Sequence, residues 1–323
     1  MNQNAPDFSA RGPYAVGVRQ THIPSPFGSP DGEGESDSVR SLPTEIWYPA
    51  EAGQSESEDA AHPLGVRHRA TSGLMPFSTP CPLVAFSHGN SGLRQQSTFL
   101  TTHLASWGFV VVAPDHVGNT FNEMMALPDE EARQATHRRI RGLRPHDIHA
   151  VIRALLDGRH LSNELPLLDP ERLGLLGHSF GGWTALKVPA LESRVTAICG
   201  LAPASEPFVG RKAFDPGELP LSEKIRSLVL AARDDVLVDL DTSIRPLADR
   251  LGPDSQLEIV DRADHFHFCD GLEMLHKMHE NNPRENQHQP TRPIAELRDE
   301  PDMHAFLNER VARFFAETLR TTG

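Results

Sequence analysis

The residues most suited to chemistry lie in a glycine-rich segment, Gly177-His178-Ser179-Phe180-Gly181. Its Gly-x-Ser-x-Gly spacing is typical of a serine on a sharp turn between a buried strand and a helix. A serine hydroxyl is a weak nucleophile unless such a turn exposes it beside a base and beside amides that stabilise an oxyanion. Apolar residues 173–176 precede the turn, and 183–188 can form a helix. These flanks favour a catalytic nucleophile, Ser179, over a plain glycine-rich turn with a surface serine.

An orienting carboxylate is expected after Ser179, because hydrolases of this topology place nucleophile, acid and base in that chain order. Residues 227–238 form a predicted strand followed by Asp234 and Asp235. We favour Asp235, since the apolar residues after it return the chain to the sheet, and keep Asp234 as the alternative. The carboxylate would hold an imidazole in the correct tautomer and stabilise its charged form.

The general base is expected after the last predicted strand, at 257–260, where His265 and His267 both occur. We favour His265, the first histidine after the turn, and keep His267 as the alternative. The short separations among Ser179, Asp235 and His265 leave little room for a large lid. We therefore expect a site that is open or covered only by loops.

Two fixed backbone amides should stabilise the oxyanion. Phe180, directly after the predicted nucleophile, supplies one N–H. The second is assigned to Asn90, in the His88-Gly89-Asn90 loop that follows the first predicted core strand. Ser91 has flanking glycines at the wrong spacing for a nucleophile turn, and His88 is expected to hold the loop rather than take part in the reaction.

From residue 83 onward, short apolar runs alternate with helical periodicities, as in a mostly parallel sheet covered by helices. We expect strands at 83–87, 109–113, 173–176, 195–199, 227–231 and 257–260, and helices at 98–107, 145–157, 181–191, 242–251 and 303–319. In the helix at 145–157, apolar residues at 148, 151, 152, 155 and 156 form one face that should pack on the sheet.

The sequence thus predicts the α/β class and a single domain over 1–323. Residues 1–82 should hold an N-terminal antiparallel β ribbon, with strands at 13–23 and 44–48, and mobile loops. Residues 83–270 should form the catalytic core, and 271–323 an insertion and a C-terminal helix.

Four polar segments lie outside the expected strands and helices. We expect 24–41 to be mobile, 50–82 to be exposed and without catalytic use, and 276–300 to be an exposed insertion. The charged segment 114–144, between a predicted strand and its return helix, should line the mouth of the site. Its charges either face water, which we favour, or bind substrate.

The formal net charge of −13 and the pI near 5.7 argue against nucleic-acid or anionic-membrane partners, which need clustered Lys and Arg. No apolar run approaches the length of a membrane helix, so no integral membrane association is expected. The start of the chain lacks a basic and apolar export signal. Three cysteines, at 81, 199 and 269, suit a reducing compartment, and we expect a cytoplasmic location.

Two groups of side chains could in principle ligate a divalent ion: His265 and His267 with Asp264, and His276 with His279. No HExxH or CxxC pattern accompanies them, and no phosphate-cradling loop or dinucleotide fingerprint is present. We therefore expect neither a metal nor a cofactor.

Several short stretches resemble a known family. They are 13–17, 46–49, 86–89, 107–110, 177–182 (GHSFGG) and 265–268. Together they are similar to the α/β-hydrolases, and more narrowly to the dienelactone-hydrolase-related group that includes platelet-activating factor acetylhydrolases and bacterial polyester hydrolases. A true dienelactone hydrolase has Cys where this chain has Ser179, which favours ordinary carboxylic esters as substrates. The acetylhydrolase resemblance implies short acyl groups.

The expected function is therefore hydrolysis of small or short-acyl carboxylic esters through an acyl-enzyme, with Ser179, His265 and Asp235 as the triad. An amide hydrolase or acyltransferase with the same triad is one alternative. A non-catalytic interaction protein with a hydrolase fold is another.

Overall fold

The computed structural model describes residues 6–26, 39–57, 61–158, 160–281 and 287–319. Its strands are β1 (Val16–Ser25), β2 (Arg40–Pro49), β3 (Thr71–Ser72), β4 (Cys81–Ser87), β5 (Val110–Pro114), β6 (Leu168–His178), β7 (Val195–Leu201), β8 (Arg226–Ala232) and β9 (Ser255–Val260). Within these residues the strands form a nine-stranded sheet in the order β3-β1-β2-β5-β4-β6-β7-β8-β9. From β5 to β9 all neighbours are parallel, whereas β2 runs antiparallel to both β1 and β5.

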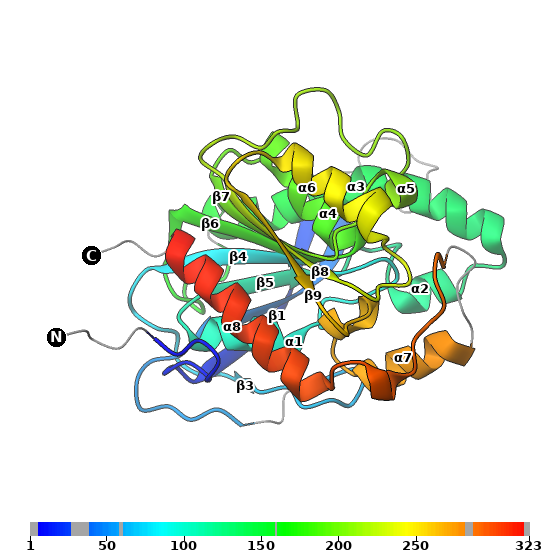
Figure 1. Cartoon of the computed structure of the whole chain (residues 1–323). Coiled ribbons are helices and arrows are strands. Elements are labelled where there is room, and N and C mark those ends of the chain that lie inside the picture. The colour runs from blue at the N-terminus through cyan, green and yellow to red at the C-terminus, as the bar shows by residue number, and fades with distance from the viewer. Residues whose placement is uncertain (1–5, 27–38, 58–60, 159, 282–286, 320–323) are drawn as a thin grey trace.

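Helices cover both faces of this sheet (Figure 1). They are α1 (Thr98–Ser106), α2 (Phe121–Met125), α3 (Glu130–Leu156), α4 (Phe180–Lys187), α5 (Glu206–Val209), α6 (Arg245–Leu251), α7 (Leu272–Asn281) and α8 (Glu300–Leu319), with single turns of other helix types at Val188–Ala190, Leu240–Ile244, His265–Phe268 and Ile294–Glu296. The apolar side chains of α1 and α8 pack on one face, and those of α3, α4 and α6 pack on the other.

Alternation along β4 explains why it needs cover on both sides. Val84 and Phe86 belong to the core under α1 and α8, whereas Leu83 and Ala85 belong to the core under α3. Successive side chains of a strand point to opposite faces, so an almost continuous apolar run is stable only between two helical layers. The predicted α/β class, the mostly parallel core sheet and the N-terminal antiparallel ribbon are confirmed.

Each predicted core strand and helix has an observed counterpart, although β6 already begins at Leu168. The predicted apolar face of 145–157 lies in the core: Ile148, Val151, Ile152 and Leu155 are buried, and Leu156 packs against them half-buried. The assignment of 1–323 to a single domain stays a prediction.

The segment 114–144, which lay outside the expected helices, is largely helical. The segment contains α2 and the first half of α3, which begins where the Asp129 carboxylate accepts a hydrogen bond from the Ala132 amide at 2.8 Å. Acidic residues at a helix N-terminus complement the helix dipole, and Glu130 and Glu131 occupy the first turn. Pro145, which suggested a helix start, lies inside the helix instead.

Two other segments are less exposed than expected. In 50–82, β3 pairs with β1, and the buried His68 accepts a hydrogen bond from the Trp47 indole at 2.7 Å. In 276–300, the first residues belong to α7, whose His276 and His279 are buried. Most of the predicted mobile loop 24–41 lies outside the described residues. No helix in the described part of the chain combines the length and apolar character needed to pass through a bilayer.

Gly142 in α3 offers a test of this longer helix. A Cβ at Gly142 would meet nothing within 4 Å, and Gly costs about 0.5–1 kcal/mol relative to Ala inside a helix. We expect Gly142→Ala to raise the free energy of unfolding by about that amount in denaturant titration. Gly181→Ala is the contrasting variant and should be strongly destabilised, because its Cβ would lie 1.9 Å from the Ser87 carbonyl oxygen. A loss of stability in Gly142→Ala would contradict a continuous helix here.

Candidate active site

The predicted site residues follow four parallel strands at their carboxyl ends. Asn90 follows β4, Ser179 follows β6, Asp235 follows β8 and His265 follows β9. Parallel strands end at the same edge of a sheet, where open α/β folds form their sites. The topology therefore collects these four residues at one edge of the molecule.

Ser179 lies in a strained turn between β6 and α4. Its φ of 55° and ψ of −118° are unfavourable for a residue with a Cβ. The turn is held on both sides: the Ser179 amide donates to the Leu201 carbonyl at 2.8 Å, and the Ser179 carbonyl accepts from the Ala204 amide at 2.9 Å. The Ser179 side chain is thereby fixed at the junction of strand and helix.

Asp235 and His265 form a buried pair. The Asp235 Oδ2 atom lies 2.8 Å from His265 Nδ1, and the two residues are 2% and 4% exposed. The other oxygen, Oδ1, accepts from the Leu237 and Val238 amides at 2.8 and 2.7 Å, which fixes the carboxylate. Because a carboxylate only accepts hydrogen bonds, Nδ1 carries the imidazole proton and Nε2 is left as an acceptor.

The alternative acid and base have other partners. Asp234 forms an ion pair with Arg292 at 2.9 Å. His267 Nδ1 accepts from the Asp264 amide at 2.9 Å, and its Nε2 donates to the Arg298 carbonyl at 3.1 Å. Burial lowers the pKa of His267 to about 4. Asp234 and His267 are therefore committed to structural contacts.

His178 connects the base to the serine turn. It precedes Ser179, its ring centroid is 4.6 Å from that of His265, and its Nε2 donates to the His265 carbonyl at 3.1 Å. The Gln96 amide nitrogen donates to His178 Nδ1 at 2.8 Å, while Gln96 Oε1 accepts from the Gly89 amide at 2.8 Å. Three separate loops are thus tied together around Ser179. Sequence reasoning assigned no role to His178 or Gln96.

The loop that holds Asn90 is fixed by its side chains. Asn90 Oδ1 accepts from the Asn119 side-chain amide at 2.9 Å. Buried His88 bonds the Gly89 carbonyl through Nδ1 at 2.8 Å and accepts from the His116 amide through Nε2 at 3.0 Å. Both His88 nitrogens therefore contact backbone, in keeping with a residue that holds the loop. Phe180, the other predicted amide donor, is buried at the start of α4.

Arg144 is fully buried behind this loop, whereas 114–144 was expected to line the mouth of the site with charges facing water. Its guanidinium donates to Asn119 Oδ1 at 2.7 Å, to Ser87 Oγ at 3.2 Å and to the His88 carbonyl. Burial lowers the pKa of Arg144 to about 9, and the nearby Asp147 opposes that shift. No sequence pattern singled out Arg144 or Asn119, because one arginine among several in a charged stretch is typical of a surface charge.

The segment after α7 supports the acid loop. The Gln289 side chain donates to the Asp235 carbonyl at 2.7 Å, and the His288 amide donates to the Val236 carbonyl at 3.2 Å. This stretch was predicted to be an exposed insertion without an assigned role. It instead contacts the backbone that presents Asp235.

A second carboxylate, Asp264, is buried beside the Asp235–His265 pair. Its Oδ1 accepts from the His265 amide at 2.6 Å and from the Val236 amide at 3.1 Å, and its Oδ2 lies 3.7 Å from His276 Nδ1. Burial, followed by the nearby Asp235 charge, raises the pKa of Asp264 to about 6. Across the described ranges, no cluster of three or more His, Cys, Asp or Glu side chains is arranged to hold a metal ion.

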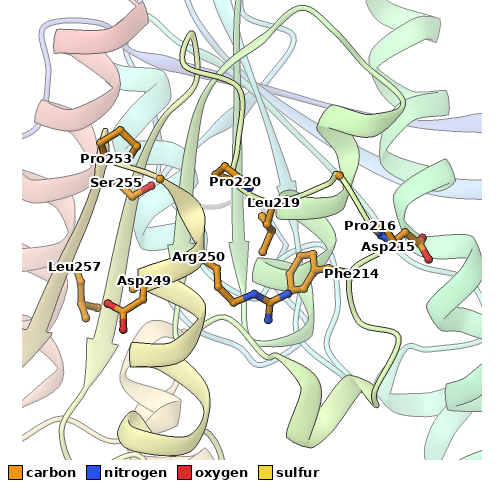
Figure 2. A pocket seen from close by; sticks show the side chains of 13 residues that line it. Phe214, Asp215, Pro216, Leu219, Pro220, Asp249, Arg250, Pro253, Ser255 and Leu257 are labelled. Atoms are coloured by element: carbon orange, nitrogen blue, oxygen red, sulfur yellow. The ribbon is translucent and has the colours of Figure 1, made fainter.

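A cavity of about 940 Å³ lies away from the predicted residues (Figure 2). It is lined by the 214–220 loop and by residues from α6 to β9, with Arg250 positioned 5.5 Å from the Phe214 ring centroid. None of Ser179, Asp235 and His265 lines it.

Comparison with known proteins agrees with this fold. Residues 67–141 match the family model of platelet-activating factor acetylhydrolase, isoform II. Lipase 1 of Moraxella sp. (strain TA144) is 30% identical over 168 residues, 51% of this chain and 41% of the relative. Platelet-activating factor acetylhydrolase of Canis lupus familiaris is 27% identical over 180 residues, 46% of this chain and 38% of the relative. The chain thus spans about two fifths of the length of the curated relatives it matches.

A solved structure, a ferulic acid esterase from Streptomyces cinnamoneus, superimposes with a TM-score of 0.70 at 22% identity and covers 98% of this chain and 92% of that chain. This chain has the α/β-hydrolase fold. Within that class it is similar to the platelet-activating factor acetylhydrolases, in a stretch that includes the Asn90 loop and ends before Ser179.

Because Asp264 is buried, we expect the stability difference between the wild type and Asp264→Asn to depend on pH. Its pKa of about 6 in the folded chain exceeds the ~3.9 of an unfolded one, so its ionisation weakens the native state. The protonated Asp264 carboxyl contributes fully to the stability of the folded chain below the pKa of the unfolded state. That contribution is lost as the pH rises to about 6 and remains absent at higher pH. Asp264→Asn keeps an oxygen for both amides and carries no charge. We expect denaturant titration to give this variant a free energy of unfolding on the order of 2 kcal/mol higher than that of the wild type at pH 7.5. The difference should be much smaller at pH 4.5.

Asp264→Ala is the matched control. It removes the acceptor for the Val236 and His265 amides and should be destabilised at both pH values. An Asp264→Asn difference that is equal at pH 4.5 and 7.5 would argue against a buried, titrating carboxylate.

Proposed function

We propose that this chain is a serine hydrolase that cleaves carboxylic esters through an acyl-enzyme intermediate. The observation that carries the proposal is the buried 2.8 Å contact between Asp235 and His265 beside the strained turn of Ser179. An acid, a base and a nucleophile in this arrangement can activate a hydroxyl without a metal or cofactor.

In the proposed reaction, Ser179 Oγ attacks the ester carbonyl carbon while His265 Nε2 takes the hydroxyl proton. Asp235 stabilises the imidazolium through Nδ1. The amides of Asn90 and Phe180 donate to the oxyanion of the tetrahedral intermediate. The carbon–oxygen bond to the alcohol then breaks, and the alcohol leaves with the proton from His265. Water repeats the sequence on the acyl-enzyme and releases the carboxylic acid.

The substrate class is supported by relatives named acetylhydrolase and lipase and by a structural neighbour named esterase. We propose a small-molecule ester with a short acyl group. We also propose a cytoplasmic location, because three cysteines, an odd and sparse set, suit a reducing compartment better than a disulfide framework.

Substrate panels test the reaction class. We expect p-nitrophenyl acetate and butyrate to be hydrolysed and matched anilides to be turned over far more slowly. Ser179→Ala should reduce kcat by about a thousandfold or more, because it removes the attacking oxygen, while leaving the unfolding transition in place.

Labelling by a fluorophosphonate probe tests the alternative that the chain is a non-catalytic protein with a hydrolase fold. The folded wild type should be labelled and Ser179→Ala should not. Turnover of anilides without esters would indicate an amide hydrolase, and an unlabelled wild type would indicate a non-catalytic protein.

The choice of base is tested by a pair of variants. His265→Ala should lower kcat by about a thousandfold or more, because proton transfer from Ser179 is lost. His267→Ala should keep kcat within a few-fold and lower the free energy of unfolding by about 1–3 kcal/mol, because two buried hydrogen bonds are lost. Kinetics and denaturant titration on both proteins measure the two effects. The reverse pattern would assign the base to His267.

A further inference from the structure

Arg144 is a fully buried charged side chain near the proposed site, with 0% of its surface exposed. We propose that Arg144 is a positioning residue that holds both oxyanion amides, those of Asn90 and Phe180, in the geometry the reaction needs. The inference rests on the proposed ester hydrolysis. It is carried by contacts that run from a single guanidinium to each amide donor.

One set of contacts leads to Asn90. Arg144 Nη1 donates to Asn119 Oδ1 at 2.7 Å, and Asn119 Nδ2 in turn donates to Asn90 Oδ1 at 2.9 Å. Arg144 Nη2 also donates to the His88 carbonyl, two residues before Asn90. The guanidinium thus constrains the loop at its start and, through Asn119, at the residue whose amide must face the oxyanion.

The other set leads to Phe180. Arg144 Nε donates to Thr184 Oγ1 at 3.1 Å, and that hydroxyl donates to the Phe180 carbonyl at 2.9 Å. The guanidinium carbon also lies 4.6 Å from the centroid of the Phe180 ring, within cation–π range. The first turn of α4 is therefore tied to the same group that constrains the Asn90 loop.

Only arginine can make this set of contacts. Its planar fork presents five N–H donors in fixed directions, whereas a lysine ammonium offers a compact charge at the end of a flexible chain. Burying an ionised side chain also costs free energy that well-packed apolar residues would not. A positioning role accounts for an arginine here, because a positive charge behind both amides favours the oxyanion that forms between them.

The role predicts a particular kinetic signature. Oxyanion contacts strengthen as the tetrahedral intermediate forms, so their loss lowers kcat while KM stays nearly constant. Loss of one donor outright costs about 10²–10³ in kcat. Misplaced donors should cost less, and we expect Arg144→Lys to lower kcat by about 10- to 100-fold with KM within about threefold.

The experiment compares Arg144→Lys with Arg11→Lys. Arg11 makes a comparable fork, to Glu56, Thr102 and the Arg69 carbonyl, but contacts none of the proposed site residues. We would measure kcat and KM on p-nitrophenyl acetate and the inhibition constant of an aliphatic trifluoromethyl ketone, which forms a tetrahedral adduct with an active-site serine. Arg144→Lys should weaken the ketone by about the factor lost in kcat, and Arg11→Lys should change neither value.

Two further variants keep the test decisive if Arg144→Lys does not fold. Asn119→Ala cuts the link to Asn90, and Thr184→Val cuts the link to Phe180. Each should lower kcat and ketone affinity together by about fivefold or more, because each releases one donor. A purely structural role would lower the unfolding temperature and leave both values unchanged, which would overturn the inference.

Failure of the proposed function looks different. A wild type with neither ester turnover nor ketone inhibition would overturn the hydrolase and the role of Arg144 together. A wild type that is active, beside an Arg144→Lys variant of equal kcat and ketone affinity, would overturn the role of Arg144 alone.

Discussion

The positive φ of Ser179 is the constraint on which the rest of this structure depends. A non-glycine residue adopts that conformation only where its surroundings compensate for the strain. Here the end of β7 and the residues just after it hold the Ser179 backbone, through hydrogen bonds to both its amide and its carbonyl. The close approach of α4 to β4 requires Gly181, whose Cβ would collide with the Ser87 carbonyl. The packing of α4 on the parallel sheet therefore helps to position the Ser179 hydroxyl.

The same edge of the sheet has a second constraint, which is electrostatic. Arg144 lies under the Asn90 loop, and Asp147, one turn further along α3, pairs with Arg40 and lies 3.0 Å from His116 Nδ1. Burial raises the pKa of Asp147 to about 6, and the two arginines oppose that shift. Buried charges need partners on all sides, so this network fixes α3, β2 and the β4 loop relative to one another. The hydrogen bonds that hold Ser179 and the charged network behind it thus stabilise adjacent parts of one edge.

Sequence patterns predicted the parts of the molecule that depend on apolar burial and on chain order. Runs such as those of β4 and β8 identified the sheet, and the order of Ser179, Asp235 and His265 selected a pair that lies in contact. Sequence patterns could not predict the part of α3 before Pro145, because that part is rich in charged residues and lacks a clear helical repeat of apolar residues. The buried face of α3 is also partly polar. Arg144, Asn119 and Gln96 were missed for a related reason: their roles are set by partners distant in the chain, and no local spacing records those partners.

The residues after α7 illustrate the same limit and its consequence. Gln289 and His288 donate to the carbonyls of Asp235 and Val236, and Arg292 pairs with Asp234. A polar, proline-containing stretch therefore adds contacts to a loop that Asp264 and Ala263 also hold, through the amides of Val236 and Asp234. In the proposed triad these contacts would help to keep the Asp235 carboxylate aligned with His265. A segment with the composition of an exposed insertion thus contacts the backbone that carries Asp235, the proposed acid, and composition alone records no such contact.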